Sequence, residues 1–244
     1  MAEWFEDWFN TEEYLYVYSH RNEEDAKNLF DLITKNILIE KSSKVLDLAC
    51  GAGRHSILFA KNGFDVTAVD ISENLLNVAS LRAKELGLNI NFIKSDLRKL
   101  NLTEKFQLII NLFTSFGYFE NDDENGEVIK IASQHLVDNG YFILDFFNIT
   151  YLKNNLIPIS YDKIKEGIIK QERVIKEDRI VKKIIITRKG IEKSYYESVR
   201  AYTKEELLSF FNNNGLKVEC IYGNYLGNNF EEESSPRIII IAQK

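Results

Sequence analysis

The 244-residue sequence contains only two prolines, two cysteines and one methionine. The cysteines, Cys50 and Cys220, lack metal-type spacing, so the sequence excludes a disulfide framework and a structural zinc site. The scarcity of proline, together with 45% hydrophobic residues, argues against a disordered chain. We therefore predict a well-packed protein with one main core and no resident metal.

Long apolar runs are also missing. No stretch of about 18 apolar residues occurs, so no membrane-spanning helix is predicted. Residues 1–16 are acidic and aromatic, whereas a signal peptide begins with basic residues followed by an apolar run. With no disulfides expected, these features favour a cytoplasmic protein that does not contact a membrane.

A global excess of positive charge is absent as well. The formal net charge is -6, which excludes a protein-wide field that gathers nucleic acid. The charge is uneven, because residues 163–200 contain twelve basic and six acidic side chains. Two readings of this basic segment stay open: recognition of an anionic small molecule, or an ordinary solvated surface.

Short apolar strands alternate with amphipathic helices through the first half of the chain. Ser72 is placed to cap one of the helices, and glycines end two of them. This alternation predicts a doubly wound, Rossmann-like α/β fold with a mostly parallel sheet. The predicted strands are 44–48, 65–70, 89–95, 106–112 and 141–147, and the predicted helices are 22–36, 54–62, 73–86 and 124–137, with a turn at 138–140.

The alternation stops after Asn148. Three β-rich runs, separated by the pairs Glu177-Asp178 and Lys189-Gly190, predict an inserted antiparallel meander at 167–176, 179–188 and 192–201. Helix 204–213 and antiparallel strands 216–225 and 236–242 then complete a seven-stranded sheet. We expect three parts: an N-terminal helical cap at 1–37, a core at 38–148 and 203–244, and an inserted lid or substrate subdomain at 149–202.

The loop after the first strand is the main candidate site. In a doubly wound sheet, ligands bind at the carboxyl ends of the strands, where the segment KVLDLACGAGRH at 44–55 places its glycines. A phosphate loop would need Lys and Ser or Thr after Gly53, but Arg54 and His55 follow. A dinucleotide loop would need glycine where Ser56 stands, which disfavours a nicotinamide oxidoreductase.

Four ordered segments carry a family resemblance: the glycine loop, Asp70 within 66–72, and the segments 93–100 and 110–119. Together they resemble class I S-adenosylmethionine-dependent methyltransferases, which usually have glycine where Ala49 stands. The resemblance implies a Rossmann-like fold, S-adenosylmethionine as cofactor, S-adenosylhomocysteine as product, and methyl transfer by in-line displacement. An aromatic segment at 14–21 and Thr114-Ser-Phe-Gly-Tyr118 resemble a branch whose N-terminal segment closes over the cofactor.

The resemblance assigns three carboxylates to the cofactor. Asp47 faces the ammonium group, Asp70 accepts both ribose hydroxyls, and Asp96 accepts the adenine amino group. Simpler roles stay open, because Asp70 is also placed to cap the next helix and Asp96 to cap a turn. In the same way, Gly51 and Gly53 let backbone amides approach the amino-acid end. The remaining cofactor residues implied are Tyr18, Arg21, Ala49, Ile71, Leu97, Asn111 and Leu112.

The resemblance leaves catalysis less defined. Alignment of the reactants contributes roughly 7 to 11 kcal/mol in favourable cases, so no nucleophilic residue is needed. If the acceptor is protonated, His20 is the preferred base and Tyr118 a further catalytic candidate. We expect His55 to pack near the glycine loop and His135 to lie at the surface. Acceptor-binding candidates are Tyr14, Tyr118, Asn148, Arg200, Tyr202 and Arg237.

Several acceptor classes stay open at this stage. A small molecule is favoured, with oxygen, nitrogen or carbon as the nucleophile. RNA or protein is disfavoured by the acidic pI and by the sequence Asn111-Leu-Phe-Thr114, where an amino-methylating enzyme would have an Asn/Asp-Pro-Pro-Tyr-type motif. A nonenzymatic protein that binds the cofactor or its product is a further alternative, and the sequence leaves a homodimer open.

Overall fold

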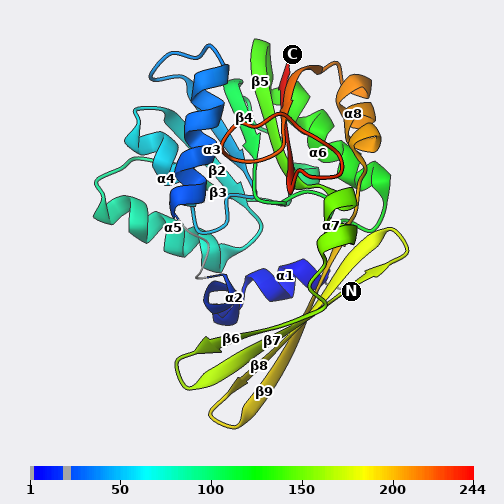
Figure 1. Cartoon of the computed structure of the whole chain (residues 1–244). Coiled ribbons are helices and arrows are strands. Elements are labelled where there is room, and N and C mark those ends of the chain that lie inside the picture. Colours follow the sequence, from blue (N-terminus) through cyan, green and yellow to red (C-terminus); the bar gives the residue numbers. More distant parts are fainter. Residues whose placement is uncertain (1–2, 19–22) are drawn as a thin grey trace.

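The computed structural model describes residues 3–18 and 23–244, and Figure 1 shows an α/β core with a second sheet below it. The core sheet has seven strands in the order β10-β11-β5-β4-β1-β2-β3. β11 is antiparallel to both neighbours, and the other adjacent pairs are parallel. This topology confirms the predicted fold class. The strands are β1 Lys44–Leu48, β2 Asp65–Asp70, β3 Asn91–Lys94, β4 Phe106–Asn111, β5 Leu136–Phe147, β10 Lys217–Tyr222 and β11 Arg237–Gln243.

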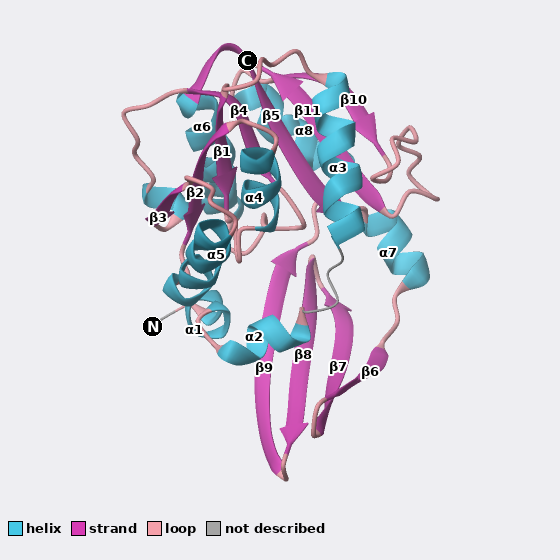
Figure 2. Cartoon of the chain, turned by 90° about the vertical axis from the view of Figure 1, so that its left-hand side faces the viewer, coloured by secondary structure: helices cyan, strands magenta, loops and turns pink. Residues whose placement is uncertain are grey.

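Helices cover both faces of this sheet (Figures 1 and 2). α3 Glu23–Asn36, α4 Arg54–Lys61 and α5 Glu73–Glu85 lie on one face, and α6 Asp122–His135 and α8 Lys204–Asn213 on the other. An apolar layer therefore lies between the sheet and the helices on each face. One layer contains Phe30 and Phe59, and the other contains Phe142 and Phe211. The central strands are buried on both faces, which explains their largely apolar sequences.

The predicted meander forms a separate antiparallel sheet in the order β6-β7-β8-β9. Its strands are β6 Ile159–Ile164, β7 Gly167–Lys176, β8 Arg179–Arg188 and β9 Ile191–Arg200. The three predicted strands and both hairpin turns are confirmed. The sequence analysis missed β6 and the short helix α7 Ile149–Asn155, because neither has a clear apolar period.

Two short N-terminal helices lie between the core and the meander (Figures 1 and 2). They are α1 Trp4–Phe9 and α2 Glu12–Val17. Trp8 stacks on Tyr195 of β9, with ring centroids 4.2 Å apart, and Phe5 stacks on Tyr118 of the core at 6.4 Å. The aromatic residues of α1 therefore contact both the core and the meander.

Two local predictions are wrong. The turn expected at 138–140 lies inside β5, where the pairing with β4 shifts by a bulge and Asn139 has a φ of 62°. His135 is buried rather than exposed, since its Nε2 accepts a hydrogen bond from the Leu102 N–H at 2.9 Å. Its Nδ1 faces the Ile131 carbonyl oxygen at 2.7 Å, so the ring closes the end of α6.

Ala49 occupies a backbone conformation that favours glycine, with a φ of 58°. We expect Ala49→Gly to raise the free energy of unfolding by about 0.5–1 kcal/mol, because glycine reaches this region without a Cβ penalty. Urea denaturation measures the change. Ala52→Gly, at a position whose φ is not positive, is the matched control and should not stabilise. A less stable Ala49→Gly protein would contradict this account of the loop.

Candidate functional site

The glycine loop is tied to the end of the neighbouring strand. The Cys50 N–H donates to the Val69 carbonyl oxygen at 2.9 Å, and the Gly51 N–H donates to Asp70 Oδ2 at 2.7 Å. These bonds hold the loop where β1 and β2 both end. The position was predicted correctly from the sequence, because the loop directly follows the first strand of a doubly wound sheet.

Asp70 is buried and has both carboxylate oxygens in use. In addition to the Gly51 bond, Oδ1 accepts from the Ser72 N–H at 2.8 Å. Burial raises the pKa of Asp70, and these backbone amides oppose the rise. The predicted cap Ser72, rather than Asp70, caps α5 by accepting from the Leu75 N–H. The helix-cap alternative for Asp70 is therefore excluded, and its oxygens keep lone pairs for a ligand.

Asp47 lies at the end of β1 and is also buried. Ser56 Oγ donates to its Oδ2 at 2.5 Å. Burial is the main cause that raises the pKa of Asp47 to about 7, and the nearby charge of Asp70 adds to it. A positive charge near these two acids would favour their ionised forms. The pair thus forms an acidic floor suited to a cationic group.

The two glycines of the loop have different roles. At Gly51, with a φ of 56°, no protein atom lies within 4 Å of the place where a Cβ would project. At Gly53 a Cβ would lie 2.7 Å from the Ala79 Cβ, so this glycine permits close packing of α4 against α5. Only Gly51 lines a cavity. The geometry therefore gives Gly53 a packing role in place of the predicted cofactor contact.

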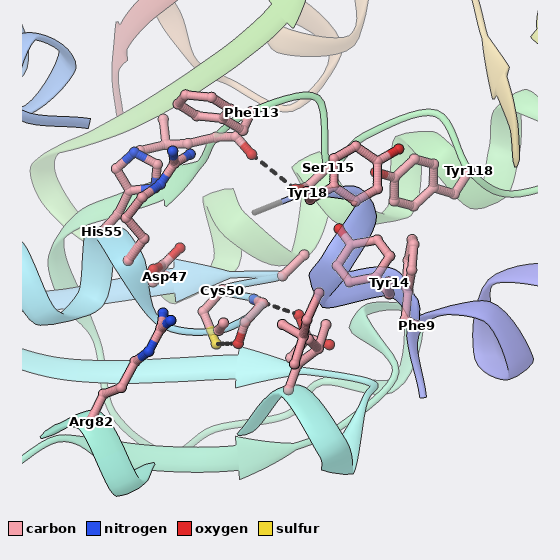
Figure 3. A pocket seen from close by; sticks show the side chains of 18 residues that line it. Phe9, Tyr14, Tyr18, Asp47, Cys50, His55, Arg82, Phe113, Ser115 and Tyr118 are labelled. Carbon is pink, nitrogen blue, oxygen red and sulfur yellow. Dashed lines mark hydrogen bonds between the residues drawn. The ribbon is translucent and has the colours of Figure 1, made fainter. Parts of the chain in front are cut away.

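A cavity of about 300 Å³ opens above the glycine loop (Figure 3). Its floor includes Asp47, Gly51 and Asp70, and its wall includes Leu112 and Phe113 at the end of β4. We call it the first cavity. Aromatic side chains from the N-terminal helices and the segment after β4 close it; these are Phe9, Tyr14, Tyr18 and Tyr118.

A second cavity of about 50 Å³ lies beside the first and shares part of its lining. Ile71 and Leu97 line it with Asp96 and Val128, and Asp70 borders both cavities. Apolar side chains surround an acid at one end, a composition that suits a flat heteroaromatic ring with a hydrogen-bond donor. The sequence analysis had assigned Ile71, Asp96 and Leu97 to one such ring, and the structure brings them together.

Asp96 also has the simpler role that the sequence left open. It caps the short 3₁₀ helix η1 Leu97–Lys99 by accepting from the Arg98 N–H, and it pairs with the Arg98 guanidinium at 2.6 Å. Burial raises the pKa of Asp96, but the bonds from Arg98 outweigh it, so the net shift is downward. Asp96 is thus held ionised at the rim of the second cavity.

Glu197 of β9 is a residue that the sequence analysis missed. Tyr18 Oη and Trp8 Nε1 donate to its Oε1 at 2.5 and 2.7 Å, and Lys182 Nζ pairs with Oε2 at 2.9 Å. These bonds lower the pKa of Glu197, although its burial opposes them. Glu197 therefore fastens α1 and α2 to the meander beside the first cavity. The residues two positions before and after Glu197 on this strand are Tyr195 and Val199, and an acid between them was the sequence signal.

Several predicted residues do not line either cavity. Asn111 is buried and its side-chain amide donates to the Leu48 carbonyl oxygen at 3.0 Å, so it joins the ends of β1 and β4. Asn148 caps α7, and Tyr202 Oη donates to Asp122 at 2.6 Å. Arg200 pairs with acids including Glu206, and Arg237 pairs with Asp145. These bonds use the polar groups within the protein, so the geometry does not support acceptor contacts for Asn148, Arg200, Tyr202 or Arg237.

Two predicted site residues, His20 and Arg21, lie outside the described residues. Residue 22, where the predicted helix 22–36 begins, also lies outside them. Within residues 3–18 and 23–244, no group of three or more potential ligand side chains could hold a metal ion. Residues that the sequence analysis did not assign to the cavity but that line it include Arg54, His55, Phe113 and Ser115.

The combined cavities fit S-adenosylmethionine on three observations. Buried acids stand where cationic and hydroxyl groups would bind, Gly51 leaves space open for a ligand, and Ile71 and Leu97 form an apolar slot. The order of these features along the sheet edge matches the order of amino acid, ribose and adenine in the cofactor. The two cavities adjoin, since Ala49 and Asp70 line both of them.

Comparison with known proteins agrees with this geometry. Residues 45–140 match the family described as a methyltransferase domain. The dTDP-3-amino-3,4,6-trideoxy-alpha-D-glucopyranose N,N-dimethyltransferase of Streptomyces venezuelae is 28% identical over 121 residues, 50% of this chain and 48% of that protein. The chain thus spans about half the length of the curated relatives it matches.

Solved structures match nearly the whole chain. An S-adenosylmethionine-dependent methyltransferase from Clostridium acetobutylicum has a TM-score of 0.81 and 21% identity, covering 95% of this chain and 97% of that one. CalS10, an amino pentose methyltransferase from Micromonospora echinaspora solved with S-adenosylmethionine, has a TM-score of 0.70 and 18% identity, covering 96% and 97%. These likenesses show a shared fold that includes the region of the meander.

Proposed function

We propose that this protein, whose residues 45–140 match the methyltransferase domain family, transfers a methyl group from S-adenosylmethionine to a small-molecule acceptor. The observation that carries the proposal is the adjoining pair of cavities, with Asp47, Asp70 and Asp96 spaced along one sheet edge. The cofactor supplies an activated methyl group, and the protein binds it, aligns the acceptor and excludes water.

Each carboxylate then has one binding role. Asp47 balances the positive charge at the amino-acid end, Asp70 accepts from the ribose hydroxyls, and Asp96 accepts from the adenine amino group. Tyr14, Tyr18 and Tyr118 present aromatic surface to the first cavity, where a cationic centre is favoured over ring faces. Tyr118 Oη donates to the Thr114 carbonyl oxygen at 2.7 Å, which supports a role for this ring in shaping the site.

A small acceptor is favoured by the position of the N-terminal helices. α1 and α2 lie between the core and the meander (Figure 2). Phe9, Tyr14 and Leu15 of these helices line the first cavity, and Trp8 and Val17 pack against the meander. We interpret residues 1–37 as a cap and 149–202 as a substrate wall, which together admit small molecules more readily than folded RNA or protein. The names of relatives that act on amino sugars support the same class.

The cellular setting and assembly belong to the same proposal. None of the helices in residues 3–18 and 23–244 is long and apolar enough to cross a membrane. We propose that the enzyme acts in the cytoplasm. A homodimer is compatible with the proposal and is not needed by it, because the described cavities are lined by one chain.

The direct test of activity is transfer of isotope-labelled methyl from S-adenosylmethionine to a panel of small amines, phenols and carboxylates. Bulk RNA and unfolded protein are assayed in parallel. Labelling of a small molecule alone is expected. Labelling of RNA or protein alone would contradict the acceptor class, and cofactor binding without labelling of any acceptor would favour a nonenzymatic binding protein.

Asp47 makes cofactor binding dependent on pH. Its pKa of about 7 means that it is mostly ionised at pH 8 and mostly protonated at pH 6. A ligand ammonium prefers the ionised form, so we expect the affinity for S-adenosylhomocysteine to fall about tenfold between pH 8 and pH 6. Calorimetry at both pH values measures this ratio. The Asp47→Asn protein should show weaker binding without this dependence, and an equally steep dependence there would rule out Asp47 as its source.

A further inference from the structure

The turn after β4 is left-handed at two consecutive residues that are not glycine. Phe113 has a φ of 58° and Thr114 a φ of 63°. Side chains with a Cβ disfavour this region, so contacts around the turn must hold it. Leu112 and Phe113 both line the first cavity, and the conformation of the turn therefore sets the shape of the cavity wall.

The side chain that holds the turn is Asp145 of β5, which is fully buried. Its Oδ2 accepts from the Phe113 N–H at 2.9 Å, and its backbone carbonyl accepts from the Thr114 N–H at 3.0 Å. Both left-handed residues are therefore bonded to the same residue on the adjacent strand. Asp145 does not itself line either cavity.

Two residues that are distant in sequence, Arg237 and Tyr225, hold the carboxylate of Asp145 in place. Arg237 Nε donates to Asp145 Oδ1 at 2.8 Å and its guanidinium pairs with the same oxygen at 2.7 Å, while a further N–H donates to Thr114 Oγ1 at 3.1 Å. Tyr225 Oη donates to Asp145 Oδ2 at 3.1 Å. The Tyr225 ring also stacks on Phe113, with centroids 5.4 Å apart. All these contacts converge on the turn at 113–114.

The orientation of one peptide follows from this network. A trans peptide places its N–H and C=O on opposite sides, so the bond from Phe113 N–H to Asp145 directs the Leu112 carbonyl the other way. That oxygen accepts from Ser115 Oγ at 2.9 Å, and Ser115 lines both cavities. Rotation of this peptide would move the Leu112 carbonyl and the Phe113 ring together.

We propose that Asp145 is a positioning residue, which holds the Leu112–Phe113 peptide so that this wall of the first cavity fits the amino-acid end of the cofactor. Arg237 and Tyr225 support it by holding its carboxylate. The inference rests on the proposed function, because it assigns the first cavity to that end of S-adenosylmethionine. In this proposal Arg237 acts through Asp145 and does not bind the acceptor.

The test compares two ligands on the purified full chain. S-adenosylhomocysteine has the amino-acid end, and 5′-methylthioadenosine lacks it. For Asp145→Asn we expect the calorimetric affinity for S-adenosylhomocysteine to fall about tenfold and that for methylthioadenosine to stay within about twofold. Asp138→Asn, at an exposed position of the same strand, is the matched control and should change neither.

Two more variants guard against a merely structural effect. Tyr225→Phe keeps the ring stack and removes one donor, so it should fold and lose about threefold in affinity for S-adenosylhomocysteine alone. Adding Thr114→Gly to Asp145→Asn should restore about threefold of the lost affinity, because glycine adopts the left-handed conformation without support.

The possible results distinguish failure of the positioning role of Asp145 from failure of the proposed function. Unchanged affinities in both single variants, or equal loss for both ligands, would overturn the positioning role while leaving the proposed cofactor in place. A wild-type protein that binds neither ligand would instead contradict the proposed function, and the inference with it. Selective loss for S-adenosylhomocysteine with rescue by Thr114→Gly is the result that the structure predicts.

Discussion

Asp70→Asn is expected to weaken S-adenosylhomocysteine binding about 100-fold, a loss of about 2.7 kcal/mol. The side chain keeps its size but loses its charge, and one oxygen becomes an NH₂ group. Since Asp70 Oδ2 accepts from the Gly51 N–H and Oδ1 from the Ser72 N–H, that group would face a backbone donor at one of the two positions. The variant therefore removes a ribose acceptor and loosens the glycine loop at once.

Calorimetry with S-adenosylhomocysteine measures this effect. Asp65→Asn is the matched control, because Asp65 stands at the exposed beginning of the same strand, β2, away from both cavities. Its affinity should equal that of the wild type. If Asp70→Asn binds as tightly as the wild type, Asp70 does not contact the ribose and the order of groups along the sheet edge must be revised.

Glu197→Ala is expected to lower the free energy of unfolding by about 3 kcal/mol. The change leaves Lys182 without its carboxylate and removes the acceptor for Tyr18 Oη and Trp8 Nε1. Both partners in the Lys182–Glu197 pair are only 13% exposed, so solvent cannot replace the lost bonds well. Because Tyr18 lines the first cavity, binding of S-adenosylhomocysteine should weaken as well.

Urea denaturation measures the stability, with Glu192→Ala as control because Glu192 is exposed on the same strand, β9. The control should change the free energy of unfolding by no more than about 0.5 kcal/mol. Glu197→Gln, which keeps one acceptor, should lie between the wild type and Glu197→Ala. A Glu197→Ala protein as stable as the control would show that the contact between α2 and the meander contributes little.

The regular part of the fold was predictable because its signals are local. Alternating apolar strands and amphipathic helices, the Ser72 cap and the two hairpin turns of the meander each depend on a few neighbouring residues. The binding loop followed from the same source, since the end of β1 is a ligand site in any doubly wound sheet. The sequence signals of these elements can therefore be recognised without knowledge of tertiary contacts.

The remaining features depend on residues that meet only in the folded chain. Nothing near Arg237 in sequence indicates that it would pair with Asp145 across strands β5 and β11. Gly53 matched the family pattern, but its space is limited by Ala79 on the next helix. Likewise, the local pattern placed His135 at the surface because it could not show the Leu102 N–H that faces it.

The central claim is that the glycine loop and the three acids hold S-adenosylmethionine. Titration calorimetry of the purified protein with S-adenosylhomocysteine and, separately, with NAD tests it most directly. The account predicts micromolar binding of S-adenosylhomocysteine and no measurable binding of NAD. Binding of NAD without binding of S-adenosylhomocysteine would contradict it and would favour a nicotinamide-dependent oxidoreductase.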